Sequence, residues 1–334
     1  MNEVVAEMRS AVSIVALTVV LGASCGTGSR PSLMAPEASV STTVAPSTTT
    51  VTTTTAAPRP EAPNGRTYPV IPADPSALAE QLVAVERALR DDSTPAGLLP
   101  DLGHTQQVIY RVLGRNPQWD PQFLAAIPDD LVADVASHLA ARRAFIDLGS
   151  DYEPAQRVPA WAIVDPEPPE ALLGYYREAE EATGIEWEYL AAINLVETGM
   201  GRIVGLSTAG ARGPMQFIPT TWDEVGEGSI DDPHDSIQAA ARYLVRRGGP
   251  TDMDRALWGY NNADEYVVAV GEYADLLRRD VRNFVGIYNW EIHYFAALGD
   301  LWLPVGYHVE ESFPALEYIE TAPWSSSPPP LTQQ

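Results

Sequence analysis

One glutamate, Glu197, stands where an apolar helix gives way to a glycine-rich loop. Helical spacing within IEWEYLAAINLVETG places Leu190, Ile193 and Glu197 on one face. The carbonyl dipoles of a last helical turn disfavour a carboxylate, and apolar neighbours add a desolvation cost, so both effects favour the protonated acid. A glutamic acid that keeps its proton near neutral pH can donate it to a leaving oxygen. The position fits a general acid, and it also fits an ordinary solvated helix end.

Two further motifs follow Glu197-Thr198 in order, Gly213-Pro214-Met215-Gln216 and then Tyr260-Asn261. This succession resembles the lytic transglycosylases of the soluble, goose-lysozyme-like type, in which a catalytic glutamate before Ser precedes a Gly-x-Met-Gln stretch and a Tyr-Asn pair. The resemblance covers residues 165 to 278. Here Thr198 stands in the place of the serine. The stretch VETGMGRIVG is also similar to a membrane-bound transglycosylase family, so the subfamily stays open, and both alternatives place the acid at Glu197.

The resemblance implies a reaction in which Glu197 protonates the oxygen between N-acetylmuramic acid and N-acetylglucosamine. The same carboxylate then takes the proton of the muramyl C6 hydroxyl, which attacks its own C1 and closes a 1,6-anhydro ring. An intramolecular nucleophile, with effective molarities of about 10⁵ M or more, removes the need for a second residue that holds a water. The implied partner is the glycan strand of peptidoglycan, with no cofactor. The implied substrate-binding residues are Thr198, Met215, Gln216, Tyr260 and Asn261.

Structural alternatives exist for several of these residues. Met215 is also a typical core residue, Tyr260 fits a half-buried helix position, and Asn261 fits the cap of the next helix. We expect Trp222 and Trp258 to pack in the core.

A second carboxylate would favour a hydrolysing muramidase over a transglycosylase. We assign Glu224 to a capping box with Thr221, and Asp232 to a helix N-cap, whereas Asp223 and Asp231 stay unassigned. Two alternatives therefore remain, a muramidase and a catalytically idle glycan-binding protein of the cell wall.

Periodicity predicts a mainly α protein, and the resemblance implies that its catalytic domain is lysozyme-like. Residues 75–150 form a helical N-terminal subdomain, and 151–279 form the transglycosylase domain, in which Gly184 ends one helix. Residues 280–322 form a C-terminal extension with a strand or two, and 323–334 form a loose tail.

The N-terminal residues 1–25 have the pattern that is typical of an export signal. The apolar run at 11–21 is too short to span a bilayer and has the length of a signal-peptide core, so 1–25 is interpreted as a signal peptide. The true start is Met1 or Met8. Cys25 stands where a lipoprotein cysteine would stand, which predicts a lipid anchor to the cytoplasmic membrane or secretion to the cell wall. The Thr- and Pro-rich residues 26–74 are predicted to be a disordered tether.

Charge and composition exclude some classes of protein. The formal net charge of −24 argues against a nucleic-acid partner, which requires a basic face. The five histidines are scattered without zinc-site spacing, so no metal site is predicted. A single cysteine rules out an intrachain disulfide.

Overall fold

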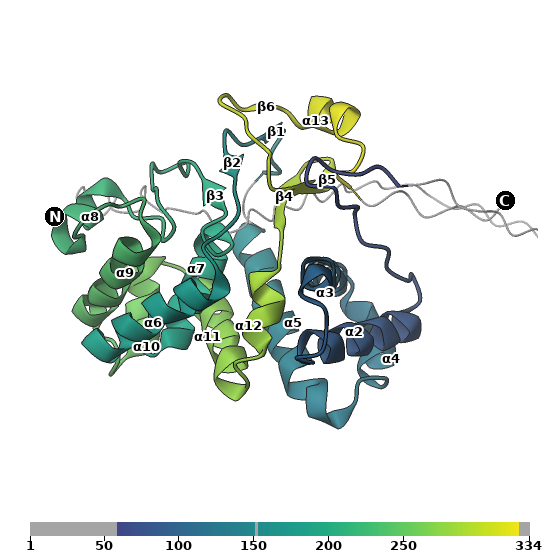
Figure 1. The fold of residues 1–334 in the computed structure, drawn as a ribbon, viewed down its shortest axis with the longest axis horizontal. Coiled ribbons are helices and arrows are strands. Elements are labelled where there is room, and N and C mark those ends of the chain that lie inside the picture. Colours follow the sequence, from purple (N-terminus) through teal and green to yellow (C-terminus); the bar gives the residue numbers. More distant parts are fainter. Residues whose placement is uncertain (1–58, 151–152, 327–334) are drawn as a thin grey trace, which may run out of the picture.

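The computed structural model describes residues 59–150 and 153–326 and confirms the mainly α fold (Figure 1). The first group of helices contains α2 (Pro75–Leu89), α3 (Leu99–Gly114), α4 (Asp120–Leu124) and α5 (Asp129–Gly149), with 3-10 turns at Ala96–Leu98 and Pro117–Trp119. The second group contains α6 (Pro169–Thr183), α7 (Trp187–Thr198), α8 (Pro219–Val225), α9 (Pro233–Arg247), α10 (Met253–Tyr260), α11 (Asp264–Arg279) and α12 (Asn283–Tyr288). Helix α13 (Ala315–Thr321) lies near the C-terminal end of the described chain.

Three small antiparallel pairs of strands lie along one side of the helices (Figure 1). Strands β1 (Arg157–Val158) and β6 (Phe313–Pro314) pair, as do β2 (Ala162–Ile163) and β3 (Ile203–Val204). The third pair is the hairpin of β4 (Ile292–Ala296) and β5 (Gly299–Leu303), which confirms the strands predicted in the C-terminal extension.

The caps predicted at Asp232 and Gly184 are confirmed, and Asp74 is a further N-cap that the sequence analysis did not assign. Asp74 and Asp232 accept hydrogen bonds from backbone N–H groups in the first turns of α2 and α9, and Gly184 ends α6 in the left-handed conformation. The predicted capping box at Thr221 and Glu224 is wrong. Helix α8 begins three residues earlier, at Pro219 with Ile218 as its N-cap, because proline suits the first turn of a helix, and Glu224 instead pairs with Arg246 at 3.0 Å.

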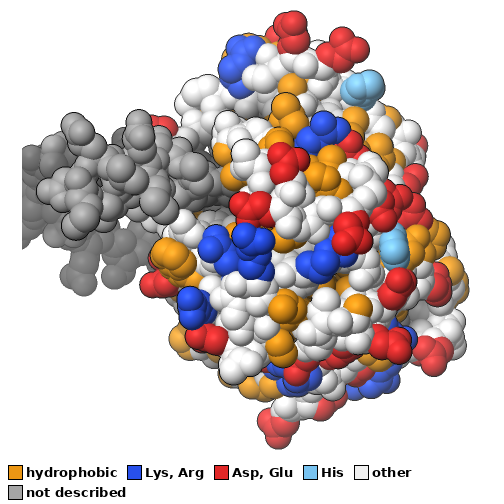
Figure 2. Space-filling view, turned by 90° about the vertical axis from the view of Figure 1, so that its left-hand side faces the viewer, with side chains coloured by type: hydrophobic (Ala, Val, Ile, Leu, Met, Phe, Trp, Pro, Cys, Tyr) orange, Lys and Arg blue, Asp and Glu red, His pale blue; other side chains and the backbone are white. Residues whose placement is uncertain are grey.

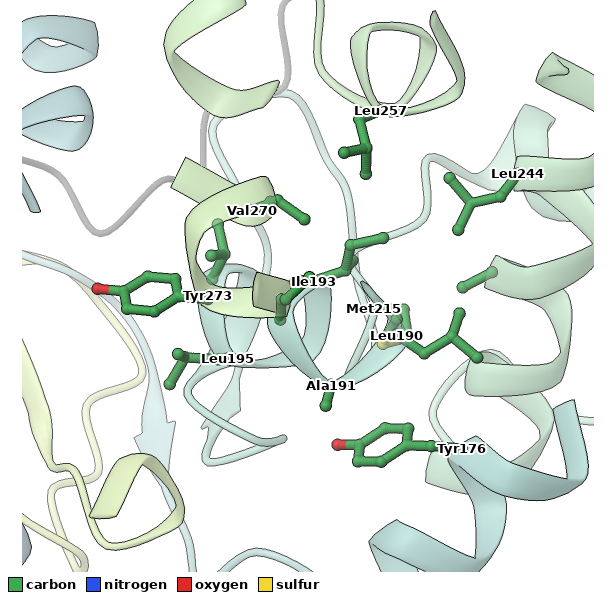
Figure 3. Close-up of a cluster of buried hydrophobic side chains, with 14 of the residues drawn as sticks. Tyr176, Leu190, Ala191, Ile193, Leu195, Met215, Leu244, Leu257, Val270 and Tyr273 are labelled. Carbon is green, nitrogen blue, oxygen red and sulfur yellow. The ribbon is translucent and has the colours of Figure 1, made fainter. Parts of the chain in front are cut away.

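Helix α7 is the centre of the largest hydrophobic core (Figure 3). Leu190 and Ile193 are fully buried, and Figure 3 shows them among side chains from α9, α10 and α11. A helix covered on most sides is apolar around most of its circumference, and the sequence LAAINLV meets that requirement. The core therefore holds α7 rigidly, and its C-terminal end carries Glu197.

The proposed boundary at residue 150 does not separate two independent cores. Helix α5 packs along α11, and its residues Ala141, Ala144, Phe145 and Leu148 belong to the same cluster as α7. A second cluster joins α2, α3 and α4 to the first half of α5. The N-terminal helices thus form one continuous body with the helices that carry the motifs.

The prediction of a disordered linker up to residue 74 is wrong for its last part. Ala62 and Tyr68 are buried against Val108 and Trp302, and Arg66 forms ion pairs with Asp101 and Glu291. These aromatic and charged side chains offset the entropy cost of ordering the segment. Residues 26–58, and Cys25, lie outside the described residues.

The predicted loose tail is also wrong for residues 323–326. The carbonyl of Ser325 accepts a hydrogen bond from the backbone N–H of Trp302 at 2.7 Å, and the side chain of Ser325 is buried. Residues 327–334 lie outside the described part of the chain.

No helix among the described residues is both long and apolar enough to cross a bilayer. Figure 2 shows carboxylates and arginines interspersed over one face of the molecule, without a continuous basic patch on that face.

Candidate active site

The end of helix α7 is shaped by Gly199. This residue adopts a left-handed conformation (φ 61°), and the N–H groups of Gly199 and Met200 close the helix on the carbonyls of Leu195 and Asn194 at 2.9 and 3.1 Å. The chain therefore turns sharply after Thr198, so Glu197 lies in the last full turn, as predicted.

The carboxyl of Glu197 is almost fully enclosed, since only 6% of the residue is exposed. Its Oε1 accepts a hydrogen bond from the hydroxyl of Tyr266 at 2.8 Å. Burial raises the pKa of Glu197 from 4.5 to about 8, and the Tyr266 hydrogen bond opposes part of that rise. The direction matches the prediction from the sequence. At neutral pH this residue carries a proton that it can donate.

Tyr266, rather than Tyr260, is the hydrogen-bond partner of the acid. The hydroxyl of Tyr260 donates instead to the carbonyl of Met215 at 2.8 Å, and its ring stacks on that of Tyr266 with centroids 6.3 Å apart. Tyr260 thus lies beside the hydrogen-bond partner of the acid, and its predicted binding of substrate stays a prediction. Helical spacing of Tyr266 with Ala269 and Tyr273 indicates an inward face, but nothing in that spacing identifies Glu197 as the partner.

Thr198 and Met215 hold the fold together around the acid, and their predicted contact with substrate stays a prediction. Thr198 is fully buried, and its hydroxyl donates to the carbonyl of Pro214 at 2.6 Å and accepts from the N–H of Gly201 at 3.0 Å. Asn194 Nδ2 donates to the same Pro214 carbonyl at 3.0 Å. The Met215 side chain is fully buried in the core. Hydrogen bonds from Asn194 and Thr198 therefore hold the loop after Gly213 against helix α7. A hydrogen bond from Tyr260 holds the same loop against helix α10.

The glycine of the Gly-x-Met-Gln motif is required by geometry. Gly213 has φ 78°, and a Cβ there would overlap the carbonyl of Ile230. Gln216 also has positive φ, at 50°, and its Nε2 donates to the carbonyl of Gly213 at 3.0 Å. This tight turn leaves the Oε1 of Gln216 without a hydrogen-bond partner among the described residues.

A hollow of about 180 Å³ lies beside this turn, and its lining includes Gln216, Tyr260 and Asn261. The structure therefore brings together three of the predicted substrate-binding residues. The Oδ1 of Asn261 also has no hydrogen-bond partner within the described chain. Two buried carbonyl acceptors at one hollow suit a ligand rich in O–H and N–H donors, such as an N-acetylated sugar. Asn261 ends helix α10, and Ala263 is the N-cap of α11, so the alternative role of Asn261 as an N-cap is wrong.

The other carboxylates considered as a second acid have different roles. Asp231 forms an ion pair with Arg212, Asp232 caps α9, and Asp223 is exposed. Among the described residues, no second carboxylate contributes to the shifted pKa of Glu197. The arrangement is that of one acid with one tyrosine.

Two further sequence expectations have mixed outcomes. Trp222 packs against the core, but Trp258 is 47% exposed, so the prediction for Trp258 is wrong. It lies on the solvent side of α10, whose first turns bury Ala256 and Leu257 instead. Potential ligand atoms of Asp232, His234 and Asp235 lie within 4.8 Å of one another, but both aspartates already accept hydrogen bonds from backbone N–H groups.

Comparison with known proteins agrees with this geometry. Residues 174–275 match the family described as "Transglycosylase SLT domain", and this range holds Glu197, the tight turn and Tyr266. The chain therefore contains a domain of the SLT transglycosylase family. A stretch of 74 residues is 35% identical to a protein named membrane-bound lytic murein transglycosylase F from Thiobacillus denitrificans (strain ATCC 25259 / T1). That stretch covers 22% of this chain and 16% of the relative, so the chain spans only a small part of the relative's length. No solved structure matches the chain.

Proposed function

We propose that this protein is an exported lytic transglycosylase that cleaves the β-1,4 bond between N-acetylmuramic acid and N-acetylglucosamine in peptidoglycan. The observation that carries the proposal is the buried Glu197, with a pKa near 8, a tyrosine partner and, among the described residues, no second carboxylate that shifts its pKa. The name of the relative, which includes lytic murein transglycosylase, supports the same class of reaction.

In the proposed reaction the protonated Glu197 donates its proton to the glycosidic oxygen as the bond to C1 breaks. N-acetylglucosamine leaves with a free 4-hydroxyl. The C6 hydroxyl of the muramyl residue forms a bond to C1, and its proton returns to the Glu197 carboxylate. The enzyme is restored, and the muramyl product is a 1,6-anhydro sugar. Tyr266 stabilises the carboxylate between these two proton transfers by its hydrogen bond.

The roles of Gln216 and Asn261 are to bind the glycan through their free carbonyl oxygens. Tyr260 stabilises the turn that carries Gln216 by donating a hydrogen bond to the carbonyl of Met215. Thr198 and Met215 position the turn through their contacts within the fold.

The test is to incubate the protein with purified peptidoglycan and weigh the soluble muropeptides. Anhydro products are one water lighter than hydrolysis products and lack a reducing end on the muramyl sugar. The control Glu197→Gln keeps the side-chain shape and should lower turnover by roughly 10²- to 10⁴-fold. Ordinary reducing ends would select the muramidase, and bound but uncut glycan would select an idle binding protein. Undiminished cleavage by Glu197→Gln would overturn the role of Glu197.

We also propose that the protein is exported and anchored through a lipid on Cys25, on the basis of the apolar run at 11–21 and the cysteine that follows it. The mature protein should partition into detergent phase, and Cys25→Ser should release it into the aqueous phase. Equal partitioning of the two forms would leave a secreted protein without the anchor.

A further inference from the structure

A second and larger hollow, a groove of about 510 Å³, lies on the other side of the Gly213 turn. Gly213 and Pro214 line this groove, whereas Gln216 lines the smaller hollow, so consecutive parts of one loop border both. Met200 and Gly201, which directly follow the end of helix α7, also line the groove. A ligand whose sugar is held at Gln216 would therefore have its substituents within reach of the groove.

One wall of the groove comes from outside the SLT match. It consists of residues 164–167, Val-Asp-Pro-Glu, which precede the matched range that begins at residue 174. Prolines at 166, 168 and 169 restrict this segment, and the hydroxyl of Tyr288 donates to the carbonyl of Glu167 at 3.0 Å. The wall is thus held in place before any ligand arrives, which reduces the entropy cost of binding.

The groove is acidic. Three carboxylates line it, from Asp165, Glu167 and Asp231, against one guanidinium, Arg212. Arg212 is already paired with Asp231. Within the described parts of the chain, neither Asp165 nor Glu167 forms an ion pair. Burial lowers the pKa of the nearby Arg202 guanidinium and Asp165 opposes part of that shift, but neither carboxylate is held in an ion pair among the described residues, so this preorganised wall attracts a cationic group.

The rest of the groove is apolar without being aromatic. Val204 and Leu206 are 55% and 60% exposed, and Val164 is also exposed. Among the described lining residues there is no aromatic side chain on which a sugar ring could stack. Small apolar side chains beside free carboxylates suit a short peptide that carries methyl groups and an amine, and they suit a saccharide less well.

We propose that this groove binds the stem peptide of peptidoglycan, with the amino group of its diamino-acid residue facing Asp165 and Glu167. The proposal rests on the proposed function, because the muramyl sugar held beside Glu197 is the sugar that carries this peptide. The wall at 164–167 then adds a preference for peptide-bearing glycan to the SLT domain.

The test compares the double variant Asp165→Asn/Glu167→Gln with a matched control, Glu170→Gln/Glu181→Gln. The control removes two exposed carboxylates of α6 that do not line the groove. Both are made in the full chain carrying Glu197→Gln, so that glycan is bound without being cut. The probes are glycan strands with uncrosslinked stem peptides, the same strands after amidase removes the peptides, and peptide-bearing strands whose amines are acetylated.

The groove variant should bind peptide-bearing strands about 3- to 10-fold more weakly, as expected for the loss of two partly exposed ion pairs, and the loss should shrink at high salt. Its affinity for peptide-free and for acetylated strands should stay within about twofold of the parent. The control should stay within the same range on all three probes.

Equal losses on peptide-bearing and peptide-free strands would overturn the proposal and assign the groove to sugar. Unchanged binding of all three probes would also overturn it. Turnover by the chain with native Glu197 is measured separately on peptide-bearing and peptide-free strands. An absence of cleavage there would refute the transglycosylase function while leaving the peptide-binding result to be judged by affinity.

Discussion

The buried acid should make the stability of the fold depend on pH in a way that one substitution removes. The pKa of Glu197 is about 8 in the folded protein, against an ordinary value of 4.5. Between these values the folded state keeps a proton that the unfolded state has released. The free energy of unfolding must therefore fall as pH rises from 4.5 towards 8. Below pH 4.5 Glu197 is protonated in both states. Its contribution to the free energy of unfolding is then fully present and no longer changes with pH.

The size of the effect follows from the same two pKa values. Each pH unit in this window is worth about 1.4 kcal/mol, so the whole span is worth about 5 kcal/mol. About 3.5 kcal/mol of this is lost between pH 5 and pH 8, because titration is incomplete at both ends. That loss is a large fraction of the stability of a typical domain. The burial that keeps Glu197 protonated at neutral pH therefore lowers the free energy of unfolding as pH rises.

The assay is urea unfolding of the parent and of Glu197→Gln at pH 5, 6.5 and 8. Gln cannot ionise, and its Oε1 can still accept the hydrogen bond of Tyr266, so the variant should lack the decline attributed to Glu197. Titration of the other groups is shared by both proteins and cancels in the comparison. Glu181→Gln, which removes an exposed carboxylate of α6, should follow the parent. Parallel pH dependence of the parent and Glu197→Gln would refute the argument that burial holds this proton.

Three other predictions concern the groups around Glu197. Tyr266→Phe removes the hydrogen bond that lowers the pKa of Glu197, so the alkaline limb of the activity profile, near pH 8 in the parent, should move to higher pH; a limb that stays in place would exclude this coupling. Thr198→Val should cost about 1–3 kcal/mol in urea unfolding, because it leaves the Pro214 carbonyl with one donor fewer and the Gly201 N–H without its acceptor, whereas Thr198→Ser should retain most of the stability; equal effects of Val and Ser would contradict the hydrogen-bonding role. Gly213→Ala combines positive φ with overlap on a carbonyl, so it should abolish glycan binding or destabilise the fold by several kcal/mol; a wild-type melting curve with full activity would show that the turn tolerates a Cβ.

The motif around Glu197 could be found in the sequence because its signals are local. A glutamate at the end of an apolar helix, followed by glycines, indicates a helix that stops and a backbone that turns, and both features depend on residues within a few positions. The direction of the pKa shift of Glu197 followed from the same pattern, since apolar neighbours along α7 already indicated burial.

The partners of that acid could not be found in the same way. Tyr260 stands in the recognisable Tyr-Asn motif, yet Tyr266 holds the carboxyl, and the two tyrosines differ by only six positions. Which hydroxyl reaches Glu197 depends on the crossing of α11 over α7, and this crossing is set by packing between distant segments. The internal contacts of Thr198 and Met215 could not be found from the sequence for the same reason. Only the tertiary fold shows that their polar and apolar atoms are used within the loop.

What the sequence by itself determined is the class of fold, the place of the acid and the turn that follows it, because helix periodicity, caps and glycine conformations are properties of neighbouring residues. Only the tertiary structure decided which residues face the ligand. It also decided that α5 of the N-terminal helices shares a core with α7 and α11, and that residues 164–167 form a wall of the acidic groove. The physical reason is that burial and contact across distant segments result from packing the whole chain at once, and no local pattern specifies them.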